Sequence, residues 1–224
     1  MDVKQEEVGG QASRPASLKA QQSEATRAAL IAAARALFAE RSYAAVATEE
    51  IVQAAGVTRG ALYHHFAGKL ELFEAVYEDV ERGLVEEVTR SLEGASDALE
   101  VLRRGSDAFL DACLDPAVRR ISLLEGPSVL GWERWREIDQ TYGLGMVKLA
   151  LQAAMDAGAI RPAPVEPLAH VLLGGLMEAA MLLAASPDPG QARADAGRAV
   201  AVLLDGLAAP GRAQARRARP GSRR

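Results

Sequence analysis

The chain has 224 residues, of which 49% are hydrophobic and 25% are charged, and its formal net charge is -4. This length allows one or two modest domains, and the scarcity of alternating β-branched runs argues against a β-sheet. The sequence contains no glycine-rich phosphate loop, no nucleophile elbow and no cluster with metal-ligand spacing, so we expect neither an enzyme nor a bound metal or other cofactor. A small all-α protein is the favoured class.

The net charge argues at first against a nucleic-acid partner, but the distribution of charge matters more than its sum. Residues 23–70 carry five basic side chains against four glutamates, whereas the rest of the body is acidic. The last part of the chain holds only basic charges: Arg212, Arg216, Arg217, Arg219, Arg223 and Arg224. This tail either adds sequence-independent attraction to phosphates or is a solvated, disordered segment without a specific role.

The single cysteine, Cys113, excludes an internal disulfide, and the polar N-terminal segment has no apolar signal core. We therefore expect a cytoplasmic protein with no membrane anchor. Residues 168–185 approach the length of a membrane span but include His170 and Glu178, so a buried helix is the favoured interpretation. Cys113 itself is either a small buried apolar residue or a redox sensor.

Residues 1–22 lack periodicity and carry glycines and a proline, so they predict a flexible arm. A first helix follows from about residue 23 to residue 40. Its apolar side chains repeat on one face and form a stripe made of Leu30, Ile31, Ala34, Leu37 and Phe38.

The segment 51–66, I-V-Q-A-A-G-V-T-R-G-A-L-Y-H-H-F, joins two short helical patterns through Gly56. Glycine adopts the left-handed conformation that ends a helix, so the segment predicts a helix-turn-helix. Apolar residues at helical spacing would form its core: Ile51, Ala54, Ala55, Val57, Leu62 and Phe66.

Polar groups suited to DNA gather on the second of these helices. Arg59 carries the only long forked donor there, and an arginine can pair with guanine O6 and N7. Thr58 is placed to cap the helix and to reach a phosphate or a thymine methyl. Gly60 either lets the backbone approach DNA closely or lets it pack tightly on the first helix.

A longer amphipathic helix begins after Lys69 and ends near Gly94, with Leu72, Val76, Val80, Leu84 and Val88 every four residues and Phe73 and Tyr77 beside them. Five more helices are predicted over residues 96–114, 116–124, 128–157, 164–185 and 190–208, which makes nine in all. Gly126 and Pro127 should break the chain between two of them. Gly158 with Pro162 and Pro164 should close the long one.

The helix-turn-helix and its flanks resemble the TetR (tetracycline-repressor) family of transcriptional regulators over about residues 23–85. The resemblance rests on the run Leu62, Tyr63, His65 and Phe66 with Lys69 shortly after, and on Thr26, Arg27, residues 34–38 and Tyr43 upstream. One departure lies at the start of the second helix, where relatives place two hydroxyl residues and this chain has Ala47 and Thr48. Thr48 alone must then cap that helix or contact a phosphate.

The resemblance implies a nine-helix, all-α fold with four segments: a flexible arm (1–22), a helix-turn-helix DNA-binding domain (23–70), a helical ligand-binding and dimerisation domain (71–208), and a basic disordered tail (209–224). It implies a ligand-responsive regulator, a repressor that binds a palindromic operator as a homodimer and is released by a small molecule. A helical interaction protein without specific DNA binding is the alternative.

By the same resemblance, Thr48, Tyr63, His64 and Lys69 hold the phosphate backbone. His65 either does the same or is half-buried beside Phe66. Thr58, Arg59 and Gly60 complete the expected DNA contacts.

The C-terminal domain should carry the sensor. Large apolar side chains with a few polar groups are typical of ligand cavities, and the candidates are Phe109, Cys113, Trp132, Trp135, Tyr142, Met146, Met177 and Glu178. The two tryptophans have an alternative role as ordinary core or interface anchors.

Relatives in the TetR family dimerise through their last two helices, which here are rich in small residues. The apolar contacts expected at or just behind a four-helix interface are Leu168, Leu172, Leu176, Leu183, Val200, Leu203, Leu204 and Leu207. These side chains could instead fill the core of the monomer.

Overall fold

The computed structural model describes residues 18–209, and the regular elements in this range are helices, apart from one isolated antiparallel bridge between Ile160 and Ala208. The elements are α1 (Leu18–Glu40), the 3-10 turn η1 (Tyr43–Ala45), α2 (Thr48–Ala54), α3 (Arg59–His65), α4 (Lys69–Ser91), α5 (Ala98–Ala112), the π-helix η2 (Val118–Glu125), α6 (Gly126–Leu130), α7 (Trp132–Thr141), α8 (Gly143–Asp156), α9 (Val165–Ala185) and α10 (Pro189–Leu207). The predicted all-α class is confirmed, with ten α-helices in the described residues rather than nine.

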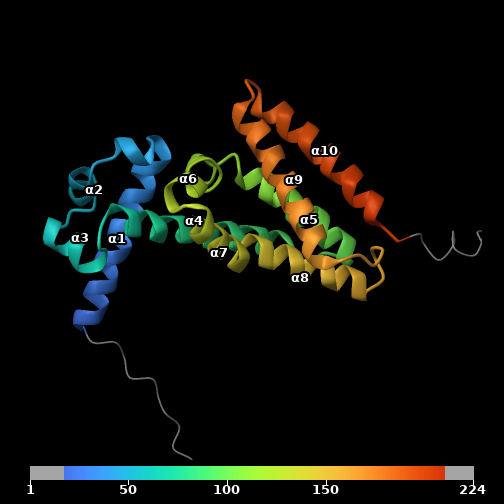
Figure 1. Cartoon of the computed structure of the whole chain (residues 1–224), viewed down its shortest axis with the longest axis horizontal. Helices are drawn as coiled ribbons and strands as arrows, with labels where there is room; N and C mark the ends of the chain where they lie inside the picture. The colour runs from blue at the N-terminus through green and yellow to red at the C-terminus, as the bar shows by residue number, and fades with distance from the viewer. Residues whose placement is uncertain (1–17, 210–224) are drawn as a thin grey trace, which may run out of the picture.

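Helices α1, α2 and α3 form a small unit at one end of the molecule (Figure 1). The predicted stripe of α1 is buried apart from Leu37, which is half-buried, and Ile51, Leu62 and Phe66 close the core beneath it. Gly56 has φ +66° and ends α2 as expected. Ala54 was wrongly assigned to this core, since it ends α2 on its exposed side.

The first helix is longer than predicted. It begins at Leu18, so residues 18–22 belong to α1 and not to a flexible arm. Residues 1–17 and the predicted arginine tail beyond residue 209 lie outside the described residues.

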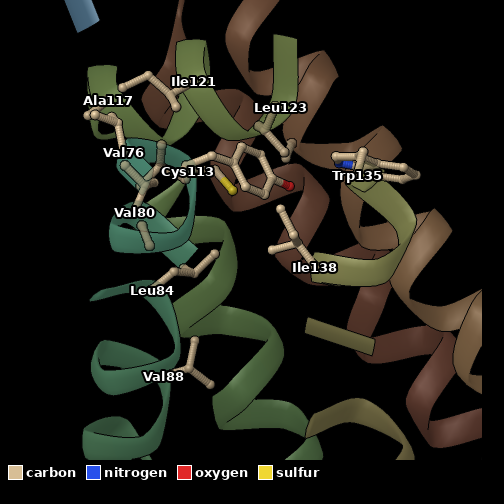
Figure 2. Close-up of a cluster of buried hydrophobic side chains, with 14 of the residues drawn as sticks. Val76, Val80, Leu84, Val88, Cys113, Ala117, Ile121, Leu123, Trp135 and Ile138 are labelled. Carbon is tan, nitrogen blue, oxygen red and sulfur yellow. The ribbon is translucent and has the colours of Figure 1, made fainter. Parts of the chain in front are cut away.

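Helix α4 joins the N-terminal unit to the rest of the chain. It packs on α1 at one end and on α5, η2 and α8 along its length (Figure 1). Its four-residue apolar repeat and the flanking Phe73 and Tyr77 are all buried, as predicted. Figure 2 shows Val76 and Val80 of α4 packed beside Ala117 and Ile121 at η2.

The helix predicted over residues 128–157 is in fact three helices. Gly131 has φ +79° and separates α6 from α7, and Tyr142, with φ -101° and ψ -86°, separates α7 from α8. Gly126 and Pro127 do not break the chain, because Gly126 is helical and Pro127 lies in the first turn of α6, where a missing N–H is tolerated. Gly158, with φ +67°, follows α8 as expected.

Helices α9 and α10 pack side by side over α5 and α8 (Figure 1). Among the described residues, α9 is the single helix long and apolar enough to cross a membrane by those two criteria, which core helices of soluble proteins also meet. The expected burial of this helix is found on one face only, because Val171 and Leu182 on the other face are exposed.

The π-helix η2 holds the N-terminal unit against the C-terminal one. The Nε of Arg120 donates to the carbonyl oxygen of Ala39 at 3.2 Å, and the backbone N–H of Tyr43 donates to the carboxylate of Glu125 at 2.8 Å. Both contacts fix the end of α1 and the turn that follows it against η2.

Candidate DNA-binding face and effector cavity

The outer face of α3 is polar and open to solvent. Thr58 caps the helix, as predicted, since its hydroxyl oxygen accepts a hydrogen bond from the N–H of Ala61 at 3.2 Å. Arg59, Tyr63 and His64 are exposed, while Leu62 on the opposite side is fully buried. The helix is therefore anchored by its apolar side and presents its polar side.

Arg59 is held in place on this face without being buried. Its side chain is 66% exposed, and its guanidinium lies 2.8 Å from a carboxylate oxygen of Glu49 on α2 and 5.6 Å from the ring centroid of Tyr63. An exposed ion pair of this kind contributes little to stability. The arginine is thus oriented and still free to exchange Glu49 for a DNA group.

Thr48 does not cap α2, which corrects one of the two roles considered for it. It is the first residue of that helix, and the capping residue is Ala47, whose N–H donates to the carboxylate of Glu50 at 3.0 Å. Arg41 holds the other oxygen of Glu50 at 2.6 Å. Glu50 thus supplies only the carboxylate half of a capping box, and no N-cap hydroxyl is present to accept from its own N–H. The phosphate role of Thr48 stays a prediction.

The remaining candidates on this face differ in exposure. Lys69 is half-buried, with its ammonium 4.3 Å from the ring centroid of Tyr43, and burial lowers the pKa of this amine. His65 is half-buried with its ring tilted against Phe66. A Cβ added at Gly60 would meet only the Thr58 hydroxyl, at 3.8 Å. Packing against α1 therefore does not explain this glycine.

An apolar cavity of about 90 Å³ lies among α4, α5, η2, α7, α8 and α9. Four of the predicted ligand residues line it: Phe109, Trp135, Met146 and Met177.

The other four predicted ligand residues do not line the cavity. Trp132 is 62% exposed at the start of α7, where it stacks with Arg136, and Glu178 lies on the exposed face of α9. Tyr142 lies at the break between α7 and α8. Cys113 is buried but does not line the cavity. Burial raises the pKa of its thiol to about 12, and the charge of Glu81 adds to this effect. A thiol so buried is inert as a redox sensor.

Four polar residues of the cavity were missed from the sequence, namely Glu81, Ser106, Ser122 and Asp139. The Ser122 hydroxyl donates to the Glu81 carboxylate, and Arg136 donates to Asp139 at 3.2 Å. Glu81 lies four residues after Tyr77 and three before Leu84, inside the buried stripe of α4. A charged residue in an apolar helical stripe was the signal that could have found it.

Burial sets the protonation of these carboxyls. It raises the pKa of Glu81 to about 7, with the charge of Asp139 adding to the effect and the hydroxyls of Ser122 and Tyr77 opposing it. The pKa of Asp139 is also raised by burial, against the influence of Arg136. A carboxyl poised near neutrality inside an apolar cavity marks a candidate functional group.

Most of the predicted interface leucines face the chain's own core. Leu172, Leu176, Leu183, Val200 and Leu204 are buried, whereas Leu168 and Leu207 are half-buried and Leu203 is 61% exposed. The face left open on α9 and α10 is made of Val171, Met181, Leu182, Val202 and Leu203, of which only Leu203 was among the predicted residues. The other predicted residues lie behind this face.

A helix-turn-helix unit with an exposed polar recognition helix, joined to a helical domain with an internal cavity, defines a one-component DNA-binding regulator. Comparison with known proteins gives the family. The model for bacterial regulatory proteins of the tetR family matches residues 30–76, and the model for the tetracyclin repressor-like C-terminal domain matches residues 99–207.

Individual relatives agree with this result. The Transposon Tn10 TetC protein of Escherichia coli is 27% identical over 156 residues, covering 70% of this chain and 79% of that protein. The HTH-type transcriptional activator FasR of Mycolicibacterium smegmatis is 39% identical over 85 residues, covering 38% of this chain and 39% of FasR. The crystal structure of a TetR-family transcriptional regulator from Pectobacterium atrosepticum has a TM-score of 0.74 at 32% identity, covering 86% of this chain and 98% of that one.

The chain belongs to the TetR family of bacterial transcriptional regulators. The predicted family, fold and general function, a DNA-binding and ligand-responsive regulator, are confirmed. The family consists of regulators and not of enzymes.

Replacing Glu81 by Gln is expected to remove a pH-dependent loss of stability. The folded chain keeps this carboxyl proton up to about pH 7, whereas the unfolded chain releases it near the ordinary pKa of 4.5. The folded state binds more protons in this window, so the wild-type free energy of unfolding falls as the pH rises through it, by on the order of 3 kcal/mol in total. Urea titrations at about pH 5 and pH 8 measure the difference.

The matched control is Glu87→Gln, on the exposed side of the same helix. This variant should keep the wild-type pH dependence. An equal loss of stability in wild type and Glu81→Gln over this range would show that Glu81 ionises normally.

Proposed function

We propose that this regulator binds a palindromic operator as a homodimer, with α3 of each subunit in a major groove, and represses until a small molecule enters the cavity. The observation that carries the proposal is the exposed face of α3, where Arg59 projects beside Thr58, Gly60, Tyr63 and His64 above a closed apolar core. Binding of DNA places its site of action in the cytoplasm.

The contacts divide by chemistry. Arg59 is the base-reading candidate because its forked donors match guanine O6 and N7. Thr48, Tyr63, His64 and Lys69 are the phosphate candidates, which fix register but carry no sequence information. His65, half-buried on Phe66, is the weakest of the eight candidates.

The open apolar face of α9 and α10 supports the homodimer. Val171 is 72% exposed, Leu182 63%, Val202 70% and Leu203 61%, which is much apolar surface on two neighbouring helices of a water-soluble chain. Pairing two such faces would give a four-helix interface and a two-fold axis. That symmetry requires two half-sites about one or more helical turns apart.

The sign of regulation follows from the family, in which binding over a promoter commonly blocks the polymerase. One matched relative, FasR, is named an activator. The competing reading, a helical interaction protein without specific DNA binding, lacks a reason for the exposed arginine and capped recognition helix. Selection of operator sequences from a random duplex pool, followed by gel-shift titration, tests the two against each other.

Substituting Arg59 and Lys69 separates base reading from phosphate binding. Arg59→Ala should weaken the selected operator by about 1 to 3 kcal/mol and relax the preference at one position per half-site. Lys69→Ala should weaken all sequences alike and reduce the salt slope by about one. Gel shifts at two salt concentrations measure both effects. Wild-type operator affinity in both variants would refute the assigned face.

Gly60→Ala tests whether the backbone of α3 comes close to DNA. The free protein has room for this methyl group, so stability should stay the same or rise by up to about 1 kcal/mol. Operator affinity should nevertheless fall, because the methyl group would keep the helix away from the groove. Gly83→Ala, at an open position on α4, is the control that should leave DNA binding intact. Unchanged affinity in Gly60→Ala would rule out the close approach.

A charge on the open face of α10 should separate the subunits. Val202→Asp places a carboxylate where we expect a partner, whereas Leu149→Asp does so on α8, where the side chain is 75% exposed and no interface is proposed. Light scattering after gel filtration should give a monomer for Val202→Asp and a dimer for wild type and Leu149→Asp. A monomeric wild type, or a dimeric Val202→Asp, would contradict the interface.

A further inference from the structure

The charges around the cavity are unbalanced. The side chains that line it include the carboxyls of Glu81 and Asp139 but no lysine, arginine or histidine. Asp139 is paired with Arg136 at 3.2 Å. Between residues 18 and 209, no ion pair joins Glu81 to a basic side chain, and its hydrogen bond comes from the neutral hydroxyl of Ser122.

Neighbouring groups explain why a proton stays on Glu81. Around it lie Tyr77 of its own helix, Ser122 of η2, the Cys113 thiol at the end of α5 and Asp139 of α7. The negative charge of Asp139 is partly neutralised by Arg136 and by the charge of His170. An ionised Glu81 would be a second negative charge in an apolar space. A proton is therefore the smallest cation that can balance it.

A second polar group in the wall, the Trp135 indole N–H, lies near the Tyr77 hydroxyl but makes no well-formed hydrogen bond to it. The indole nitrogen of Trp135 is buried and forms no hydrogen bond of good geometry with the described residues, although it lowers the pKa of the nearby Tyr77 hydroxyl against the larger effect of burial. Figure 2 shows the nitrogen edge of Trp135 turned toward Leu123, another residue of the wall. A buried N–H donor without an acceptor is costly, and a ligand oxygen would satisfy it.

We propose that the cavity binds a lipophilic ammonium compound that also carries an oxygen acceptor, with Glu81 as the counter-charge, Trp135 as the hydrogen-bond donor and the apolar walls around the rest. The proposal rests on the proposed function, in which this cavity is the effector site. The cation replaces the proton of Glu81, which leaves to solvent. The rings of Tyr77, Phe109 and Trp135 in the wall offer further favourable surfaces to a cation.

The same charges exclude other classes of ligand. A carboxylate ligand, such as a fatty acid, would meet two carboxyls and no basic partner in the wall. A neutral apolar ligand would fill the space but would leave Trp135 unpaired and Glu81 protonated.

Two probes that differ in charge alone test the proposal. Choline phenyl ether carries a permanent ammonium and an ether oxygen, and neohexyl phenyl ether is its neutral carbon isostere. Calorimetric titration of the full chain should detect binding of the first and at least tenfold weaker binding of the second at about pH 8. With a pKa of about 7 for Glu81, the cation should bind about tenfold more tightly at pH 8 than at pH 6 and release about half a proton at pH 7.

Glu81→Gln keeps the shape and a hydrogen-bonding group but removes the charge. It should weaken choline phenyl ether roughly thirtyfold or more at pH 8, and it should abolish proton release near pH 7. Glu87→Gln is the matched control and should bind like wild type. Equal binding of the two ethers to wild type, absence of cation binding, or full affinity in Glu81→Gln would each overturn the proposal.

Gel shifts with the selected operator distinguish this inference from the function on which it rests. Release of operator by the neutral ether with no preference for the cation would leave the ligand response standing and overturn the cation site. Tight, Glu81-dependent binding of the cation without any change in operator affinity would establish the site and refute its role as the effector site.

Discussion

The hydrogen bond from the Tyr43 backbone N–H to the Glu125 carboxylate, at 2.8 Å, ties the DNA-binding unit to the wall of the cavity. Glu125 ends η2, and Ser122 and Leu123 of the same short helix line the cavity. Ser122 and Glu125 lie three residues apart on this one short helix, so the placement of both depends on how η2 packs. A ligand that displaces Ser122 would therefore also change the support beneath η1.

Helix α4 provides the second connection between the two sites. Its first residue, Lys69, covers the ring of Tyr43, and three turns later Glu81 contacts Ser122 in the cavity. Helix α4 and the end of η2 pack this closely because residue 126 is a glycine. A Cβ at Gly126 would come within 2.5 Å of the Tyr77 ring. Together, α4 and η2 form two paths of contacts from the cavity to the recognition unit, along which a displacement at one site could reach the other.

Much of the DNA-binding unit could be predicted from the sequence because its signals are local. Gly56 must end α2, Thr58 must cap α3, and the apolar residues between them repeat at helical spacing. The start of α2 was not predictable from residue 47 alone, since its N–H is satisfied by the carboxylate of Glu50 in the first turn, and Arg41 holds that side chain.

The cavity could be predicted only in part, because it depends on contacts between distant segments. Large apolar side chains identified Phe109 and Trp135, but Trp132, three residues from Trp135, points outward once Gly131 sets the direction of α7. In α9 and in the second half of α10, apolar residues fall on more than one side of the helix. The choice between inner and outer face depended on how α5 and α8 lie beneath. Leu204 faces inward and Leu203 outward for that reason.

The pairing of Arg59 with Glu49 explains how a chain with a net charge of -4 can recognise DNA selectively. Glu49 lies beside Arg59 on the exposed surface, and its negative charge repels DNA phosphates. The sequence-independent attraction between the protein and DNA is therefore weak, and salt screens it further. In the proposed complex, exchange of Glu49 for a guanine edge would cost little, because an exposed ion pair is weak, and Arg59 would gain two charge-assisted hydrogen bonds. Non-cognate DNA offers Arg59 phosphate oxygens but no guanine edge at this position, while the repulsion from Glu49 persists. Discrimination thus arises as much from the weakness of the general attraction as from the strength of the specific contact.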